Sequence, residues 1–209
     1  PTATITASTN VLCNGACDGT ADVSAVGGTP PYTYAWSSGG TTANETGICA
    51  GTVSVTVTDA FGCVSTDNVV ITEPTILNAS ITTTTDVSCN GLCDGTATVT
   101  PGGGDGSFTY LWNDPAPAQT TATATSLCAG TWTVTVTDGN GCTATDNVTI
   151  AENLVVTATA TGTNTSCNGV CDGTATVTPG GGDGSYSYNW DDLALSTTAA
   201  INSLCANTY

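Results

Sequence analysis

The residues best suited to chemistry in this chain are its 11 cysteines, which recur in a fixed pattern. The motif C-N-G-x-C-D-G appears at 13–19, 89–95 and 167–173, at steps of 76 and 78 residues. Each copy is followed by a cysteine in I-C-A-G-T, L-C-A-G-T or L-C-A-N-T, and the first two copies also by a G-C dipeptide. Thiols repeated in this way form either disulfide bonds or metal sites.

We expect disulfide bonds within each repeat. Four cysteines allow three connectivities, and the sequence alone does not choose among them. We favour the first with the fourth and the second with the third, because a bond between the first two would only reinforce a tight N-G turn. Long-range bonds closing loops of some 30–50 residues contribute roughly 3–4 kcal/mol each. The predicted pairs are Cys13–Cys63, Cys17–Cys49, Cys89–Cys142, Cys93–Cys128 and Cys171–Cys205, with the partner of Cys167 beyond the chain end.

A zinc site with four cysteine ligands is the alternative. The C-x3-C spacing differs from the paired C-x2-C of zinc knuckles, and 13 residues separate Cys49 from Cys63. The composition is also that of a secreted protein, in which disulfides persist. Disulfides are therefore the favoured chemistry, and no metal site is predicted from the cysteines.

The charge balance excludes several classes of function. The 209 residues include 17 Asp and Glu but no Lys, Arg or His. Binders of nucleic acid or anionic membranes need clustered cations, so neither partner is expected. A histidine base, a lysine Schiff base and an arginine clamp are also missing. The adjacent Asp191 and Asp192 could be read as a glycosidase pair, but they occur in one repeat only, and we expect no enzyme activity.

Strict alternation of apolar and hydroxyl side chains predicts the fold. Val53, Val55 and Val57 alternate with Ser and Thr, as do Trp132, Val134 and Val136 in the next copy, which is typical of antiparallel strands with one wet face. Turn signals every 8–12 residues separate such runs. The chain is predicted to be all-β, with tandem immunoglobulin-like sandwiches of about 77 residues each. The recurrent Trp36, Trp112 and Trp190 are expected in their cores rather than on a carbohydrate-stacking platform.

Three repeats divide the chain. We predict a first repeat at 1–74, a second at 75–152, and an incomplete third at 153–209 that lacks its last hairpin. The linkers T-E-P (72–74) and A-E-N (151–153) are short and lack Gly/Ser runs. We therefore expect little change in the angle between neighbouring repeats. By the second repeat's spacing the missing fourth cysteine would fall near position 219, so we read the chain as an excerpt of a longer secreted polypeptide. Completion of the third repeat by a neighbouring chain is the alternative.

The acidic residues recur with the repeats. Asp18, Asp94 and Asp172 lie in turns, where Asp side chains usually accept hydrogen bonds from the backbone. Uncompensated negative charge also invites calcium, although no D-x-D-x-D-G loop is present. The weak calcium candidates are Asp67, Glu73, Asp146 and Glu152.

Four asparagines lie in N-x-S/T sequons and are candidates for glycosylation. Since Thr is abundant, chance alone generates several such sequons. The candidates are Asn44, Asn78, Asn147 and Asn164.

Together these phrases resemble the SprB-type repeats of very large surface adhesins of gliding Bacteroidota and related extracellular proteins. The matching phrases are S-C-N-G-x-x-D-G-T-A-T-V (88–99, 166–177), G-T-P-P-Y-T-Y-A-W (28–36), A-G-T-x-x-V-T-V-T-D-x-x-G-C (50–63, 129–142) and I-T-E-P (71–74). The family's common cysteines match Cys13 and Cys63, so the added pair Cys17 and Cys49 supports the nested pairing. The second and third repeats depart from the family in replacing P-P-Y by G-G-G-D-G-S.

The resemblance implies a non-enzymatic extracellular structural or adhesive repeat protein. We expect an extended stalk or filament at a bacterial cell surface, whose partners are other copies, further repeats of the same chain, or surface polysaccharide. No cofactor is expected beyond calcium and covalent glycans. The alternatives are a carbohydrate-binding tandem module, with Phe108 and Tyr186 as exposed loop aromatics, or an appendage of a larger secreted enzyme.

Overall fold

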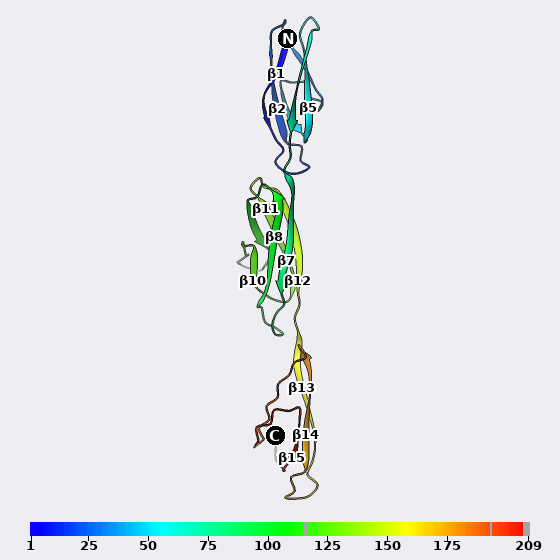
Figure 1. Ribbon diagram of the computed structural model, residues 1–209, viewed down its shortest axis with the longest axis vertical. Coiled ribbons are helices and arrows are strands. Elements are labelled where there is room, and N and C mark those ends of the chain that lie inside the picture. Colours follow the sequence, from blue (N-terminus) through cyan, green and yellow to red (C-terminus); the bar gives the residue numbers. More distant parts are fainter. Residues whose placement is uncertain (115–116, 193, 207–209) are drawn as a thin grey trace. The chain divides into compact units, whose positions relative to one another are not determined.

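The protein is all-β, as the alternating pattern predicts. The computed structural model describes residues 1–114, 117–192 and 194–206, and every regular element in these ranges is a β-strand (Figure 1). Within the same ranges, no helix has the length and apolar character needed to cross a bilayer.

The first repeat consists of two three-stranded antiparallel sheets. One has the order β1-β2-β4 and the other β3-β5-β6. The strands are β1 (Thr2–Thr9), β2 (Gly19–Val26), β3 (Thr33–Trp36), β4 (Asn44–Ile48), β5 (Gly51–Thr58) and β6 (Val64–Ile71).

The two sheets of this repeat share one core. Val53, Val55 and Val57 of β5 are buried, and they pack in one cluster with Val23 of β2 and with Trp36. Each fully buried valine contributes about 1.5–3 kcal/mol relative to an exposed one. The hydroxyl side chains between the valines face outward, which explains the period-two pattern.

Side chains of β6 bind the free edge of β1. The Asp67 carboxylate accepts a hydrogen bond from the backbone N–H of Ile5 (2.7 Å), and the Ser65 hydroxyl accepts one from Ala3 (3.0 Å). These contacts satisfy N–H groups that would otherwise be left unpaired at a sheet edge.

The second repeat has the same strand order as the first. Its sheets are β10-β8-β7 and β12-β11-β9. The strands are β7 (Thr75–Thr85), β8 (Gly95–Gly104), β9 (Phe108–Trp112), β10 (Thr123–Leu127), β11 (Gly130–Asp138) and β12 (Thr143–Ile150).

In its described residues, the third repeat has one sheet, with the order β13-β14-β15. Its strands are β13 (Leu154–Thr163), β14 (Gly173–Gly182) and β15 (Ala200–Leu204). β13 is exposed along its whole length, and Trp190 is only half-buried. Trp36 and Trp112, by contrast, are buried, so the predicted core position is confirmed for these two.

The chain divides into two compact units, and the boundary between them runs through the second repeat. The first unit comprises Pro1–Thr83, Thr98–Ala124 and Trp132–Val148, and the rest of the described chain forms the second. The repeat boundaries after residues 74 and 152 therefore stay a prediction.

Candidate functional site

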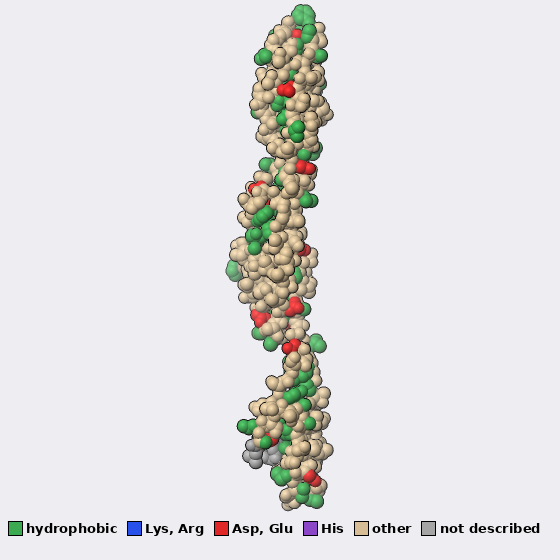
Figure 2. All heavy atoms as spheres, viewed as in Figure 1, with side chains coloured by type: hydrophobic (Ala, Val, Ile, Leu, Met, Phe, Trp, Pro, Cys, Tyr) green, Lys and Arg blue, Asp and Glu red, His purple; other side chains and the backbone are tan. Residues whose placement is uncertain are grey.

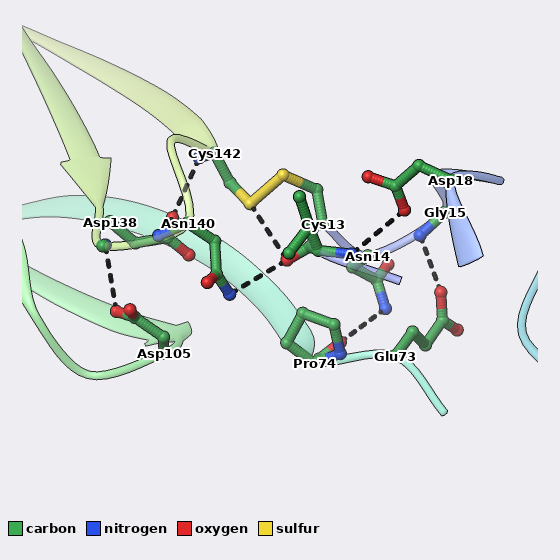
Figure 3. The surroundings of a disulfide bond; sticks show 12 residues. Cys13, Asn14, Gly15, Asp18, Glu73, Pro74, Asp105, Asp138, Asn140 and Cys142 are labelled. Carbon is green, nitrogen blue, oxygen red and sulfur yellow. Dashed lines mark hydrogen bonds between the residues drawn. A yellow bond between two sulfur atoms is a disulfide. The ribbon is translucent and has the colours of Figure 1, made fainter. Parts of the chain in front are cut away.

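A disulfide between two repeats is the most distinctive feature of the first unit. Cys13 in the first repeat is bonded to Cys142 in the second, with a sequence separation of 129 and Cα atoms 5.7 Å apart (Figure 3). We call its surroundings the repeat joint: the loop 11–19, the linker 72–74, the loop residue Asp105 and the hairpin 138–142.

Two of the predicted pairs are therefore wrong. Cys13 is not bonded to Cys63, nor Cys89 to Cys142, and Cys63, Cys89 and Cys167 are free and exposed. The reason lies in the length of β6, which begins just after Cys63 and ends beside the Cys13 loop, where Val11 donates to the Thr72 carbonyl oxygen (3.1 Å). Eight extended residues span roughly 26 Å, whereas disulfide-bonded Cα atoms lie within ~7 Å.

The other predicted pairs are present in the structure. Each bond fixes a C-N-G-x-C-D-G loop to the end of a strand in the same repeat. This strand is β4 in the first repeat, β10 in the second and β15 in the third. The bonds are Cys17–Cys49, Cys93–Cys128 and Cys171–Cys205. In the first repeat, one loop is thus anchored twice, through Cys17 to its own repeat and through Cys13 to the next.

The loop's backbone is held in a tight turn. Ala16 donates to the Cys13 carbonyl oxygen (3.0 Å), and Gly15 takes a positive φ of 76° that favours glycine. The Asp18 carboxylate accepts from the Leu12 N–H (3.0 Å). Equivalent bonds join Asp94 to Ser88 (2.9 Å) and Asp172 to Ser166 (2.8 Å), so the predicted role of these turn aspartates is confirmed.

The linker between the repeats binds this loop directly. Glu73 accepts a hydrogen bond from the Gly15 N–H (2.7 Å), and the Asn14 side-chain amide donates to the Pro74 carbonyl oxygen (3.0 Å; Figure 3). Glu73, a weak calcium candidate from the sequence, thus already has a backbone partner in the joint.

The hairpin that carries Cys142 is organised by a buried carboxylate. Asp138, only 5% exposed, accepts from the N–H groups of Asn140 (3.1 Å) and Cys142 (2.8 Å) through the same oxygen. Its other oxygen is buried without a partner in the described structure. Gly104 lies against that oxygen, where a Cβ atom would come within 2.6 Å of it, so the G-G-G-D loop needs glycine here.

Two further contacts complete the joint. Asp105 accepts from the Gly139 N–H (3.1 Å), and the Asn140 side-chain amide donates to the Leu12 carbonyl oxygen (3.1 Å). The hairpin is therefore held by its own repeat on one side and by the first repeat on the other. This arrangement fastens the first repeat covalently to the second.

The second unit contains the same loop and linker. Gly91 donates to Glu152 (3.1 Å), and Asn90 donates to the Asn153 carbonyl oxygen (3.0 Å). A cavity of about 360 Å³ lies beside Cys89. It is lined by Ser88, Cys89, Asn90, Asn153, Leu154, Val155, Val156, Gly182, Asp183, Ser185 and Tyr186. By repeat alignment, Asp183 is the equivalent of Asp105.

The hydrogen bonds to the turn carboxylates favour their charged form. At Asp94, bonds from the side chain and backbone of Ser88 hold the pKa below its ordinary value, and Ser166 does the same for Asp172. At Asp59, burial acts to raise the pKa. The backbone hydrogen bonds from Cys63, Thr29 and Phe61 together outweigh burial, so the pKa lies below its ordinary value.

The four calcium candidates do not come together. Asp67 and Asp146 bind the edge N–H groups of Ile5 and Ile81, while Glu73 and Glu152 bind the loops. Among the described residues, no three Asp, Glu, Cys or His side chains cluster as metal ligands. Figure 2 shows acidic side chains scattered over the visible surface.

The sequon asparagines are all exposed: Asn44, Asn78, Asn147 and Asn164. Phe108 and Tyr186, the candidate carbohydrate-binding aromatics, are half-buried, and the Tyr186 hydroxyl donates to the Gly181 carbonyl oxygen (2.5 Å).

Of the adjacent Asp191 and Asp192, Asp192 is held by hydrogen bonds from one residue. The backbone and hydroxyl of Ser196 both donate to the Asp192 carboxylate, at 2.7 Å, and hold its pKa below the ordinary value. A glycosidase general acid requires the opposite, a raised pKa.

Two solved structures are distantly similar to this chain. A 282-residue C-terminal fragment of intimin, solved with the intimin-binding domain of the translocated intimin receptor, is 19% identical at a TM-score of 0.40, over 74% of this chain and 66% of the fragment. A Dscam chain is 13% identical at a TM-score of 0.29, over 71% of this chain and 46% of its own length. No curated protein matches the sequence.

The SprB repeat matches three times, at residues 5–41, 81–117 and 159–195. Each matched segment contains one C-N-G-x-C-D-G loop and the aromatic triplet that ends in Trp36, Trp112 or Trp190. Because the three segments make up more than half of the sequence, the chain belongs to the SprB repeat family.

Proposed function

We propose that this chain is a non-enzymatic structural or adhesive segment of a bacterial cell-surface protein, part of an extended stalk or filament that bears tension. The observation that carries the proposal is the Cys13–Cys142 disulfide. Membership of the SprB repeat family supports the extracellular location, as do the four disulfides, which persist in oxidising compartments.

The position of this bond suits a load-bearing role. A force applied to the chain on either side of the joint passes through the sulfur–sulfur bond and bypasses the polypeptide between Cys13 and Cys142. Unfolding of the bypassed part then does not lengthen the molecule. The sequence separation of 129 corresponds to roughly 450 Å of extended chain, which cannot be pulled out while the disulfide is intact.

The composition also suits a long-lived surface structure. The sequence contains no Lys or Arg, so trypsin-like proteases have no cleavage site, and 17 acidic residues keep neighbouring copies soluble through mutual repulsion.

Immunogold electron microscopy of the native bacterial surface tests the proposal. Antibodies against this chain should label filaments or stalks that project from the cell. Label confined to the cell interior, or dispersed in the medium without any filament, would contradict it.

A further inference from the structure

We propose that Asn140 is the positioning residue of the repeat joint. Its side-chain amide docks the hairpin 138–142 on the Leu12 carbonyl oxygen and so selects Cys142 as the partner of Cys13. This inference rests on the proposed function and adds to it how the covalent connection is made. Docking comes first, and the sulfur–sulfur bond then closes between two thiols that the docked hairpin already holds together.

The Asn140 amide makes a hydrogen bond that reaches from the hairpin to the first repeat. Its nitrogen donates to the Leu12 carbonyl oxygen (3.1 Å), which is 128 positions away in the sequence. The Cys142 sulfur lies 3.4 Å from the same oxygen, and Leu12 directly precedes Cys13 (Figure 3). One carbonyl group therefore contacts both the amide and the sulfur, so docking of the amide brings Cys142 to Cys13.

The equivalent hairpin of the first repeat shows that this amide is not needed for the turn itself. Asp59 accepts from the N–H groups of Phe61 (3.0 Å) and Cys63 (2.9 Å), which are the bonds described above for the Cys142 hairpin. The glycine before each cysteine takes a positive φ, 81° in the first hairpin and 87° in the second. Phe61 stands where the second hairpin has Asn140, so the same turn forms with a side chain that has no hydrogen-bond donor.

Each hairpin is also anchored to its own repeat without the side chain at this position. Ala60 donates its N–H to the Thr29 carbonyl oxygen (2.8 Å), and Gly139 donates its N–H to the Asp105 carboxylate (3.1 Å). The Asn140 side chain is exposed and contributes to neither anchor. Its described role is therefore the contact with the other repeat.

The carbonyl group that accepts the amide is held in place by contacts within the first repeat. The Leu12 N–H donates to the Asp18 carboxylate (3.0 Å), and the Cys17–Cys49 disulfide fixes the same loop to its own sheet. Because the acceptor does not have to be ordered when the hairpin docks, most of the favourable free energy of the new hydrogen bond is retained.

A docked hairpin favours one thiol pair over the others. The chain has 11 cysteines, so many wrong pairs compete during oxidation. Holding two groups in reacting geometry raises their effective concentration. One hydrogen bond changes such an equilibrium by about three- to tenfold. Asn140 supplies a preference of this size to the Cys13–Cys142 pair.

The bond forms by exchange with a small disulfide such as oxidised glutathione. A thiolate of Cys13 or Cys142 attacks one glutathione sulfur, which gives a mixed disulfide and releases one reduced glutathione. The second thiolate then attacks the protein sulfur of the mixed disulfide and releases the other. The protein loses two protons and two electrons, and the oxidant gains them. Asn140 acts on the second step, because only that step brings the two protein sulfurs together.

The experiment uses the full chain with its three exposed free thiols replaced, as Cys63→Ser, Cys89→Ser and Cys167→Ser. The protein is equilibrated in mixtures of reduced and oxidised glutathione, and free thiols are then alkylated. Cleavage with an Asp/Glu-directed protease and mass spectrometry give the fraction of each disulfide. The same readout, followed in time from the mixed disulfide, gives the rate of the second step.

Two substitutions remove the amide. Asn140→Phe copies the first hairpin, and it should lower both the equilibrium constant for Cys13–Cys142 and the rate of the second step by about three- to tenfold. Asn140→Asp keeps the size of the side chain but sets an acceptor against the Leu12 oxygen, so it should lower both at least as much. Phe61→Ala, the matched change in the other hairpin, should alter neither.

The Cys17–Cys49 bond is the internal control, since it fixes the same loop without contacting the hairpin. Its equilibrium should stay the same in every variant. A parallel loss at this bond would overturn the proposal, because Asn140 would then support the fold and not the joint. Unchanged Cys13–Cys142 chemistry in both Asn140 variants would also overturn it. So would an equilibrium that shifts only through faster reduction, since the amide would then bind after the disulfide has formed.

The proposed function fails on a different result. If the Asn140 variants behave as the parent chain does while Cys13–Cys142 forms, the positioning role is wrong and the tension-bearing connection stands. If the parent chain does not form Cys13–Cys142 in oxidised glutathione, both the connection and the positioning role are wrong.

Discussion

Cys13 and Cys142 are bonded across a repeat boundary, so that the first cysteine of one repeat is tied to the last cysteine of the next. The loop beneath Cys13 is also bound to its own repeat through Cys17. The pair of bonds makes the joint between the first two repeats a covalent connection that does not depend on the linker peptide alone.

Cys142→Ser should weaken the first unit substantially. In the chain-entropy treatment a loop of this length contributes about 5 kcal/mol, all of which the variant loses. Urea unfolding followed by tryptophan fluorescence measures the change. The matched control is Cys63→Ser, an exposed free thiol in the equivalent hairpin, which should change stability by less than ~0.5 kcal/mol. Equal effects of the two substitutions would show that Cys142 is not bonded.

Single-molecule pulling should reveal the bypassed polypeptide. With handles at the ends of the first two repeats, the oxidised protein should unfold with a small length gain. After reduction the total gain should increase by roughly 450 Å, for the 129-residue separation. If reduction releases only the two loops closed by Cys17–Cys49 and Cys93–Cys128, with separations of 32 and 35 residues, the inter-repeat bond is absent in solution.

Asp138→Ala should destabilise the Cys142 hairpin. The variant removes the acceptor for two backbone N–H groups, which costs about 2–4 kcal/mol for charge-assisted bonds. Thiol labelling of Cys142 under mild reduction should become faster. Asp183→Ala, which removes an exposed carboxylate that accepts from the Ser185 N–H, serves as the control.

Asp67 should make stability dependent on acid. The N–H groups of Ile5 and Asn68 lower its pKa, so its folded state holds the proton less tightly than the unfolded chain does. Its contribution is present above the ordinary value of 3.8 and is lost as pH falls through the lower folded pKa. Asp67→Asn should cost about 1 kcal/mol at neutral pH and flatten the decline in stability below pH 4. Asp191→Asn, with the same charge change, is the control for stability at neutral pH.

Trp112→Ala should cost about 3–5 kcal/mol, as large truncations in packed cores do. Trp112 is 1% exposed, and its indole N–H donates to the Thr121 carbonyl oxygen (3.0 Å). Trp190→Ala, at the equivalent half-buried position, should cost less than half as much. Thermal unfolding of the two variants, each followed by circular dichroism, makes the comparison.

The strands and the capped turns could be predicted from the sequence because they depend on local chemistry. The Val/Ser/Thr alternation around Val55 allows only one face to be buried, and an aspartate such as Asp18 binds backbone N–H groups six residues away. The short pairs such as Cys17–Cys49 also follow, since they close a loop onto a neighbouring strand of the same sheet.

The partner of Cys13 could not be found by comparing cysteines within one repeat. The signal that was available is the length of β6, because an eight-residue strand must separate Cys63 from the linker that the Cys13 loop contacts. Similarly, the sequence G-G-G-D does not predict that Gly104 lies against the buried Asp138 carboxylate.

The sequence by itself determined the all-β fold, the family and the anchoring of each loop to its own repeat, because period-two burial and tight turns are properties of short segments. Only the tertiary structure decided that Cys13 bonds to Cys142 and leaves Cys63 free. The bond depends on direction and distance in space. The sequence does not show whether the Cys13 loop lies nearer to the G-C hairpin of its own repeat or to that of the next repeat.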